Sequence, residues 1–495
     1  MFVLRADAIS VAGPMRQTPP RRSMESPPTE VTLRMTEILT RHETGLDVGP
    51  LRDLLDGDVV ASGDVDWDEA RLAWNLTVDQ SPAAVVLAES AADVAATVVF
   101  AKAHGLRVAP QGTGHGAAAI GDMSDTILLK TERMRGVTID AENRVARAEA
   151  GTIWIEVVEA AAEQGLAALA GSSPDVGVVG YTLGGGLSWL ARKHGIGANQ
   201  VTAIEVVTAS GDLVRTDWAH EPDLFWALRG GGGSFGIVTA IEFNLFPLTE
   251  VYAGILWYPV DRAAEILKAW RAWTEELPDE MTSVGRILQF PPIPEIPEPV
   301  RGQSFVVLQT IWSGRPAEGA RLIEPLRTLG PVMDTVMTIP VTELSKLHMD
   351  PEGPAPGTGD GGMLDDVDEH LIDLFVEMVV GSPILSAEIR HLGGAVARRD
   401  SRHGAIDAWE APYVMYAVGI APTPEASSAV EGAVAELRHV LEPWEAEHTY
   451  LNFAESRRKA ASLFSSASYH RLRRIKAIVD PADVIRSNHP IPPAF

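Results

Sequence analysis

The chain contains no cysteine among its 495 residues. Disulfide bonds, thiolate metal sites, iron–sulfur clusters and cysteine-based catalysis are therefore excluded together. The absence of cysteine does not by itself reveal the compartment in which the protein works.

Long apolar runs are missing as well. No segment reaches the roughly 18 apolar residues of a membrane span, and the apolar run after Met1 is too short for a secretory signal. Arg21-Arg22 is followed by a polar, proline-containing stretch where a twin-arginine signal needs apolar residues. We therefore predict a cytoplasmic protein without a membrane partner. Residues 1–40, rich in Pro, Arg and Ser, are predicted to form a disordered lead.

Basic residues are scarce relative to acidic ones. The chain has 41 Lys and Arg against 67 Asp and Glu, which gives a formal net charge of −26. Such a charge repels nucleic acid, so we expect no nucleic-acid partner. The length predicts two or three cooperating units, because single hydrophobic cores stop growing at about 250–300 residues. The oligomeric state stays open.

A histidine in a glycine loop is the most informative feature that is present. The pattern predicts a strand at 83–88, a helix at 91–104 and a second strand at 106–110. The second strand leads directly into Gln111-Gly-Thr-Gly-His-Gly116. Glycines allow the backbone to lie against a large ligand, and His115 is the one reactive group there. The loop indicates a bound cofactor.

Two further glycine clusters follow. With the His115 loop as the first cluster, the second cluster runs from Gly171 to Gly195. It carries few bulky polar groups, so it can lie edge-on beneath a planar ring system. The third cluster runs from Leu228 to Phe243 and ends in an alternating strand. Together with the first loop they indicate one cofactor domain at about 65–248.

Other cofactor motifs fit less well. Residues 112–117 formally match the dinucleotide pattern G-x-G-x-x-(G/A), but the following residues lack the apolar stripe of the helix that a Rossmann loop opens. No glycine cluster continues into a Walker lysine, and no histidines stand at metal-binding spacing. We therefore expect no metal.

The chain from about 251 to 448 has a different character. Strands near 305–310 and 414–420, with amphipathic helices near 263–276 and 426–441, predict an α+β substrate domain. The segments 290–299 and 351–362 are predicted to be exposed loops.

Four polar residues of this part are ambiguous. Strand alternation places Tyr413 and Tyr416 on opposite faces, so at most one of them faces the cofactor. Glu388 and Arg390 share a face; one of them lining the site is the alternative, and surface charge on a half-exposed strand is the favoured interpretation.

Taken in this order, the glycine clusters resemble the FAD-linked oxidases of the vanillyl-alcohol oxidase superfamily, specifically the berberine bridge enzyme-like group. The resemblance covers about residues 75–250 and returns at 449–493, where Tyr450-Leu-Asn452-Phe453 is similar to the family's C-terminal signature. It implies an α+β, two-domain PCMH-type FAD-binding fold with an antiparallel-sheet substrate domain. The FAD-binding domain would be formed by 65–248 plus 449–495, and the substrate-binding domain by 251–448.

The resemblance also implies which residues hold the cofactor, FAD. In the family, the histidine matching His115 is joined to the flavin 8-methyl group. The expected FAD-binding residues are Gln111, Gly112, Thr113, Gly114, His115, Gly116, Gly171, Ser173, Val176, Gly177, Gly180, Tyr181, Gly184, Gly236, Ile237, Val238, Asn452 and Asn488.

Ser173 is a departure from the family pattern. It stands where the family usually has a cysteine joined to the flavin 6-position. A serine hydroxyl is too weak a nucleophile to replace a thiolate, whereas an imidazole can add to the flavin methyl group. We therefore expect a single covalent link, through His115. The alternative is FAD held without a covalent bond and hydrogen-bonded by His115.

The activity that the resemblance implies is oxidation of an alcohol or similar C–H group in a small organic molecule, sugar or natural-product intermediate. Hydride would pass to FAD, and molecular oxygen would reoxidise it. Tyr450 is the expected catalytic base or its partner, although a core tyrosine is the alternative; the family's second tyrosine is Phe453 here. A small residue such as Val176 near the flavin favours an oxidase. A flavin dehydrogenase with another acceptor and a non-catalytic flavin carrier stay open.

Overall fold

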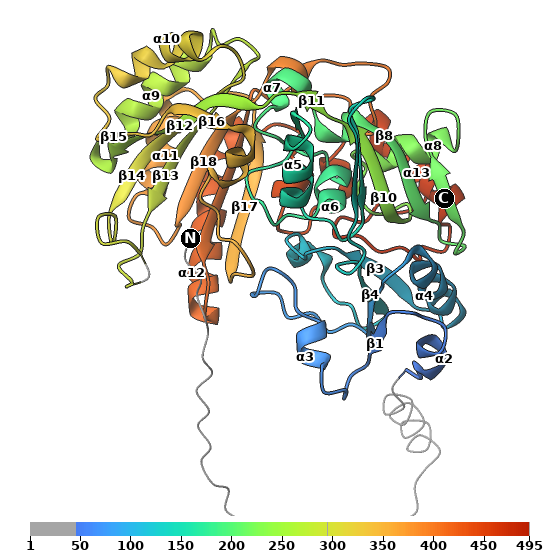
Figure 1. The fold of residues 1–495 in the computed structure, drawn as a ribbon. Coiled ribbons are helices and arrows are strands. Elements are labelled where there is room, and N and C mark those ends of the chain that lie inside the picture. The colour runs from blue at the N-terminus through green and yellow to red at the C-terminus, as the bar shows by residue number, and fades with distance from the viewer. Residues whose placement is uncertain (1–45, 295, 495) are drawn as a thin grey trace, which may run out of the picture.

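The computed structural model describes residues 46–294 and 296–494 and contains three main β-sheets (Figure 1). The predicted lead at 1–40 lies outside the described residues. Within those ranges, no helix is long and apolar enough to cross a lipid bilayer.

The first sheet has four strands in the order β1-β2-β4-β3, with β2, β4 and β3 parallel. Ser90 begins the covering helix α4, because its hydroxyl accepts a hydrogen bond from the Asp93 N–H, and Gly105 follows the helix end at a φ of +67°. The predicted strand–helix–strand order before the glycine loop is therefore confirmed. The elements are α2 (Gly49–Arg52), β1 (Asp58–Val60), α3 (Trp67–Ala70), β2 (Ala84–Leu87), α4 (Ala91–Ala103), β3 (Arg107–Gln111) and β4 (Thr126–Lys130).

The second sheet has five antiparallel strands in the order β5-β6-β10-β8-β9. Short helices and a two-stranded pair, β7 and β11, lie beside it. Its elements are β5 (Val137–Asp140), β6 (Val145–Glu149), α5 (Trp154–Ala162), β7 (Leu166–Ala167), α6 (Val178–Leu183), α7 (Ala191–His194), β8 (Val201–Val207), β9 (Leu213–Thr216), α8 (Pro222–Leu228), β10 (Ile237–Asn244) and β11 (Phe246–Pro247).

The third sheet has eight antiparallel strands in the order β15-β12-β14-β13-β18-β19-β17, with β16 also paired to β12. Its elements are β12 (Glu250–Pro259), α9 (Ala263–Thr274), β13 (Met281–Gln289), β14 (Ser304–Trp312), α10 (Pro316–Arg327), β15 (Met333–Asp334), β16 (Met337–Pro340), β17 (Gly357–Leu364), α11 (Glu369–Val379), β18 (Ser386–His391), β19 (Tyr413–Ile420) and α12 (Pro424–Leu441).

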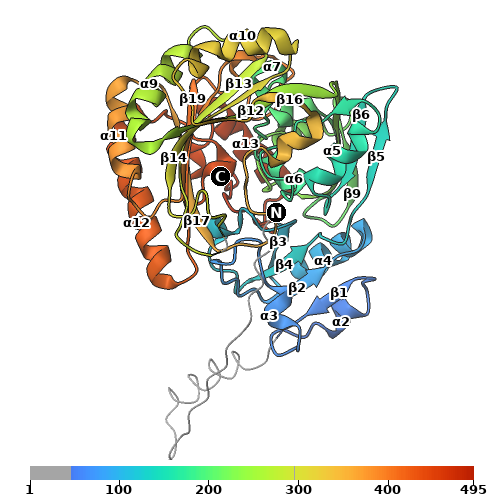
Figure 2. The same cartoon turned by 60° about the vertical axis from the view of Figure 1, so that its left-hand side comes forward.

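The four long helices α9 to α12 lie on one side of this third sheet, and the other side is turned toward the rest of the molecule (Figure 2). Strand alternation separates the two faces: Ile287 and Ile389 join the core beneath the helices, whereas Arg286 and Glu388 point the opposite way. The site-facing side of the sheet is therefore partly polar.

One sequence prediction is wrong in this sheet. The segment 351–362 was expected to be an exposed loop, but Gly357–Leu364 forms strand β17, which pairs along its whole length with β19. The glycine-rich composition of this segment is typical of a loop, so the sequence did not indicate a strand. The strand that pairs with β17 lies about 50 residues further along the chain. The prediction of a loop at 290–299 is confirmed.

The C-terminal segment returns to the first two sheets. Residues 484–486 extend along β3 through hydrogen bonds to Val108, and α13 (Ser466–Val479) contacts α8. In α13, the fully buried Lys476 ammonium lies 2.6 Å from the buried Asp480 carboxylate and donates to the Ser234 carbonyl at 2.8 Å. This buried ion pair joins the C-terminal segment to the third glycine cluster.

Lys476→Ala is expected to lower the free energy of unfolding by about 3–5 kcal/mol, because it leaves the Asp480 charge buried without its partner. Urea unfolding followed by circular dichroism measures the change. Arg474→Ala, at an exposed position of the same helix, is the matched control and should change the stability by less than about 0.5 kcal/mol. Equal stability of the two variants would contradict a stabilising role for the pair.

Candidate functional site

The first glycine loop holds His115 firmly. Its ring stacks on Trp74 with a centroid distance of 4.0 Å and an interplanar angle of 20°. Its Nδ1 lies 2.7 Å from the Thr113 hydroxyl. Gly114, at a φ of +92°, permits this turn, and an added Cβ there would come within 2.9 Å of Ala73. The imidazole is therefore fixed in orientation.

A carboxylate that the sequence analysis did not single out lies beside this imidazole. Asp175 Oδ1 is 3.5 Å from His115 Nε2. Burial by itself raises the pKa of Asp175, but His115 and the hydrogen bonds donated by Gly353 and Trp74 outweigh it and hold the pKa well below its usual range. Asp175 is therefore an anion at neutral pH.

Three glycines of the His115 loop and of the second glycine cluster have free space where a side chain would lie. A Cβ added at Gly112 or Gly177 would meet no atom closer than 3.7 Å, and one at Gly180 would meet none within 4 Å. The packing of the protein itself does not require glycine at these three positions. Gly177 lies next to Thr113 of the His115 loop, so the missing side chains at Gly112 and Gly177 leave space by this loop for a flat group, which fits the cofactor that the sequence predicts. We name these three residues the glycine strip.

Tyr450 lies at the other end of the second cluster. Its hydroxyl oxygen accepts hydrogen bonds from the Leu187 N–H at 3.0 Å and from the Asn452 side-chain amide at 2.9 Å. Burial raises the pKa of Tyr450 to about 12, although these two donors and the Arg390 charge act in the opposite direction. The phenol is therefore neutral at physiological pH, and two N–H groups are already placed to stabilise its oxygen.

The site-facing side of the third sheet carries a row of polar residues. Arg286, Glu388 and Tyr416 lie directly opposite one another on neighbouring strands β13, β18 and β19. His348 and Arg390 complete the set, which we name the polar row, because they lie 3.1 Å and 2.7 Å from the Glu388 carboxylate. The earlier interpretation of Glu388 and Arg390 as surface charge is wrong: only 1% and 7% of these residues are exposed.

Electrostatics within the polar row favour the charged forms of Glu388 and Arg390, whereas burial lowers the pKa of His348 and raises that of Tyr416, so both of these are neutral. Burial alone raises the pKa of Glu388, but the positive charge of Arg390, together with smaller contributions from His348 and Arg286, outweighs it and holds the pKa well below its usual range. The Arg390 guanidinium also lies 5.1 Å from the ring centroids of Trp189 and of Phe453. Because Phe453 packs on Tyr450 at 5.0 Å, the polar row and the phenol belong to one site.

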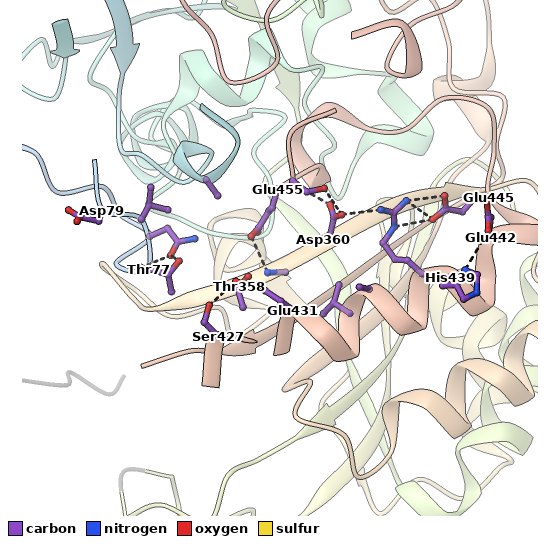
Figure 3. A pocket seen from close by; sticks show the side chains of 18 residues that line it. Thr77, Asp79, Thr358, Asp360, Ser427, Glu431, His439, Glu442, Glu445 and Glu455 are labelled. Atoms are coloured by element: carbon purple, nitrogen blue, oxygen red, sulfur yellow. Dashed lines mark hydrogen bonds and ion pairs between the residues drawn. The ribbon is translucent and has the colours of Figure 1, made fainter. Parts of the chain in front are cut away.

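A cavity of about 810 Å³ adjoins this site (Figure 3). Its lining includes Glu455, whose carboxylate accepts a hydrogen bond from Tyr416 and another from the Gly359 N–H. Tyr416 in turn packs on Phe453 at 4.8 Å. Acidic side chains outnumber basic ones in the lining, and Arg438 pairs with two of them, Asp360 and Glu445; the acidic residues are Asp79, Asp360, Glu431, Glu442, Glu445 and Glu455.

The other predicted site residues make contacts within the protein. Some are near the loop: Asn488 lies against Gly116, and Gln111 accepts from Gln80 at 3.0 Å. Several have packing roles of their own. The Tyr181 hydroxyl donates a hydrogen bond to the Leu169 carbonyl. A Cβ added at Gly171 would meet Tyr181, and one added at Gly236 would meet Val206. Val176 packs at the edge of the core, and Ile237 and Val238 are buried. These contacts leave their predicted role toward FAD a prediction.

The structure also places Ser173, where the missing cysteine was expected. The Ser173 hydroxyl donates to Asp175 Oδ1 at 2.8 Å. Asp175 could have been noticed as the single acid in a run of small residues, two positions after Ser173. The sequence around His348 has no comparable signal, and Trp74 is one of twelve tryptophans without a distinguishing pattern. Among the described residues, no group of three or more His, Asp and Glu is arranged to hold a metal ion.

Two families match the chain. An FAD binding domain covers residues 82–217, and a berberine and berberine-like domain covers residues 449–492. The first includes the His115 loop and the glycine strip, and the second includes Tyr450. Together with the fold, these matches confirm the predicted class: the chain is an FAD-dependent oxidoreductase with an α+β, PCMH-type FAD-binding fold.

Individual relatives agree with this class. An uncharacterised FAD-linked oxidoreductase of Bacillus subtilis, YvdP, is 28% identical over 458 residues, which cover 89% of this chain and 99% of that protein. A glucooligosaccharide oxidase of Sarocladium strictum is 37% identical over 188 residues, which cover 37% of this chain and 38% of that protein. The crystal structure of 6-hydroxy-D-nicotine oxidase from Arthrobacter nicotinovorans shares the fold, with a TM-score of 0.78 and 24% identity over 89% of this chain and 98% of that one.

Glu388→Gln is expected to lower the free energy of unfolding at pH 7 by about 3–5 kcal/mol, because it leaves Arg390 buried without its anion. The folded-state pKa of Glu388 is depressed, so its contribution is fully present above the unfolded-state pKa and is lost as the pH falls. The difference between wild type and variant should be constant from pH 8 to about 5 and shrink below about pH 4.5.

Urea unfolding at a series of pH values between 8 and 3 measures this difference. Glu163→Gln, at an exposed position, is the control and should match wild type within about 0.5 kcal/mol throughout. A Glu388→Gln difference that grew as the pH fell would contradict the assignment of Glu388 as a buried anion.

Proposed function

We propose that the protein is an oxidase with FAD bound along the glycine strip through a single covalent link to His115. Its reaction would oxidise an alcohol or similar C–H group of a small organic molecule, sugar or natural-product intermediate, with molecular oxygen as the final acceptor. The relatives named above oxidise an oligosaccharide and a nicotine derivative, which supports this range of substrates.

One observation carries the proposal. Residues 171–187 form one short segment whose Asp175 lies at His115 and whose Leu187 N–H binds the Tyr450 oxygen. The glycine strip residues Gly177 and Gly180 lie between these two points in the chain. A nucleophilic histidine, a bare backbone surface and a buried phenol are thus held by the same segment.

The chemistry that FAD supplies when bound is acceptance of a hydride from the substrate. Gly112, Gly177 and Gly180 would contact it through their backbone, and His115 would fix its position. The neutral Tyr450 hydroxyl would contact the reacting group of the substrate. Proton uptake by Tyr450 from a substrate hydroxyl requires its own proton to leave first, and the Leu187 and Asn452 donors would stabilise the resulting phenolate.

We further propose that substrates reach the site through the acidic cavity. Glu455 lies in its lining, and the contacts from Glu455 to Tyr416 and from Tyr416 to Phe453 lead inward to Tyr450. The polar row, which lies deeper than the cavity, would offer both hydrogen-bond donors and acceptors to a hydroxylated substrate.

Two outcomes distinguish the proposal from its alternatives. The purified protein should be yellow, and its flavin should bleach when mixed anaerobically with a reactive member of a panel of alcohols and sugars. Reoxidation in air with formation of hydrogen peroxide supports an oxidase, whereas bleaching without reaction with oxygen supports a dehydrogenase. A yellow protein inert to the whole panel supports a flavin carrier.

His115→Ala is expected to abolish the covalent link. After acid precipitation, the wild-type flavin should remain in the pellet, and the variant should release its flavin to the supernatant, because alanine offers no nucleophile. His104→Ala, at an exposed position, is the control and should resemble wild type. Wild-type flavin recovered entirely in the supernatant would refute the link.

Tyr450→Phe is expected to slow anaerobic flavin reduction by a factor of about 10²–10⁴ while the FAD content is unchanged, because it removes only the hydroxyl that contacts the substrate. Stopped-flow absorbance of the flavin measures the rate. Tyr469→Phe, on the partly exposed side of α13, serves as the control. A Tyr450→Phe rate within twofold of wild type would show that the hydroxyl takes no part in the reaction.

A further inference from the structure

The Asp175 carboxylate joins three segments at the one imidazole that the proposed function uses. Its Oδ2 accepts hydrogen bonds from the Trp74 indole N–H at 2.6 Å and from the Gly353 N–H at 2.9 Å. Its Oδ1 accepts from the Ser173 hydroxyl at 2.8 Å and faces His115 Nε2 at 3.5 Å. Three donors, from Trp74, Ser173 and Gly353, thus fix one carboxylate beside one histidine.

This arrangement selects one tautomer of His115. A carboxylate can only accept hydrogen bonds, so Asp175 favours the proton on Nε2. Nδ1 then carries a lone pair and accepts the hydrogen bond from the Thr113 hydroxyl, 2.7 Å away. The nitrogen that can act as a nucleophile is therefore Nδ1, and the ring plane is set by stacking on Trp74.

We propose that Asp175 is the positioning residue for flavin attachment: it keeps the proton of His115 on Nε2 and stabilises the positive charge that the imidazole gains when Nδ1 forms its bond. The inference rests on the proposed single link through His115. Asp175 acts on the flavin only through the histidine.

Atoms and electrons balance in the proposed attachment of the flavin to His115. A bond forms between His115 Nδ1 and the 8-methyl carbon of the flavin, one C–H bond of that methyl group breaks, and its proton leaves to solvent. The Nε2 proton is then lost to solvent, so the ring ends neutral and Asp175 stays an anion. The electron pair of the broken C–H bond stays with the flavin as two-electron reduction, and molecular oxygen removes that pair and is reduced to hydrogen peroxide.

Ser173 gains a role in this arrangement. At this position the berberine bridge enzyme-like group usually has a cysteine that forms the second flavin bond. Here the hydroxyl donates to the same carboxylate oxygen that faces His115. The residue that would make a second link therefore supports the group that prepares the first.

The experiment follows covalent attachment over time rather than turnover. The full-length protein is produced under riboflavin limitation and incubated with FAD in air, and the covalent fraction is read from the intact mass and from flavin fluorescence on a denaturing gel. Attachment in Asp175→Asn is expected to be about 10–100-fold slower than in wild type, the range found when carboxylate partners of metal-binding histidines are removed. Non-covalent FAD binding should change little. The melting temperature is expected to fall, because Asn does not replace the charge that three donors stabilise, so the rates are compared at a temperature at which both proteins are folded.

Matched variants separate positioning from a general structural effect. Asp175→Glu keeps a carboxylate and should restore attachment in part, whereas Ser173→Ala removes one donor and should slow it by less than Asp175→Asn does. If Asp175→Asn does not fold, Trp74→Phe decides the question, because it keeps a ring for stacking and removes the donor to Oδ2; slower attachment supports the proposal, and an unchanged rate contradicts it.

The two possible failures are distinguishable. If wild type attaches FAD and Asp175→Asn attaches it at the same rate, the role of Asp175 is wrong and the link through His115 stands. If wild type forms no covalent bond in air with excess FAD, the proposed link itself is wrong, and the inference falls with it.

Discussion

The close contact between Gly184 and Asn452 is the constraint on which the site depends. The Asn452 side-chain amide occupies the place that a Cβ at residue 184 would take, so the second glycine cluster and the C-terminal segment can meet only if residue 184 is glycine. From that position the amide donates to the Tyr181 carbonyl and to the Tyr450 oxygen. The phenol is thus placed by a contact between residues about 270 positions apart.

This constraint gives the glycine clusters two separate purposes. At Gly184 the absent side chain makes room for another part of the protein, whereas at Gly180 it leaves open space. The third cluster resembles Gly184 in this respect, because it also lies close to another part of the protein: its Ser234 carbonyl accepts a hydrogen bond from the buried Lys476 ammonium of α13. Glycine-rich sequence in this chain therefore marks close approach of the C-terminal segment as well as the surface available to FAD.

The polar row presents the opposite physical situation, since it is costly to bury. Burying an ion pair costs desolvation energy that its Coulombic attraction often only just recovers, and an apolar pair of similar volume would serve stability as well. The helix-covered face of the same sheet has such an apolar core, with Ile287 and Ile389 next in sequence to Arg286 and Glu388. Under the proposed function, the charges on the site-facing side would contact a polar substrate.

The sequence could predict what depends on neighbouring residues. Alternation, glycine stops and capping residues predicted β2, α4 and β3 within one residue at each end, and the motif order predicted the flavoprotein class. The assignments of individual residues to FAD and the domain boundaries remain predictions. The sequence could not predict contacts between distant segments. Asp175 and His348 meet their partners only when the chain folds, and strand β17 pairs with a strand about 50 residues away.

The proposed function would divide flavin attachment and reaction from substrate selection. One short stretch of chain, 171–187, contributes Asp175, which lies beside His115, and Leu187, whose N–H binds the Tyr450 oxygen. The polar row comes from a different sheet, whose strands can change their site-facing residues without disturbing those contacts. Proteins with this fold are named for substrates as different as an oligosaccharide and a nicotine derivative. Under the proposed function, Arg286, His348, Glu388 and Arg390 would be the residues in which a preference among substrates is encoded.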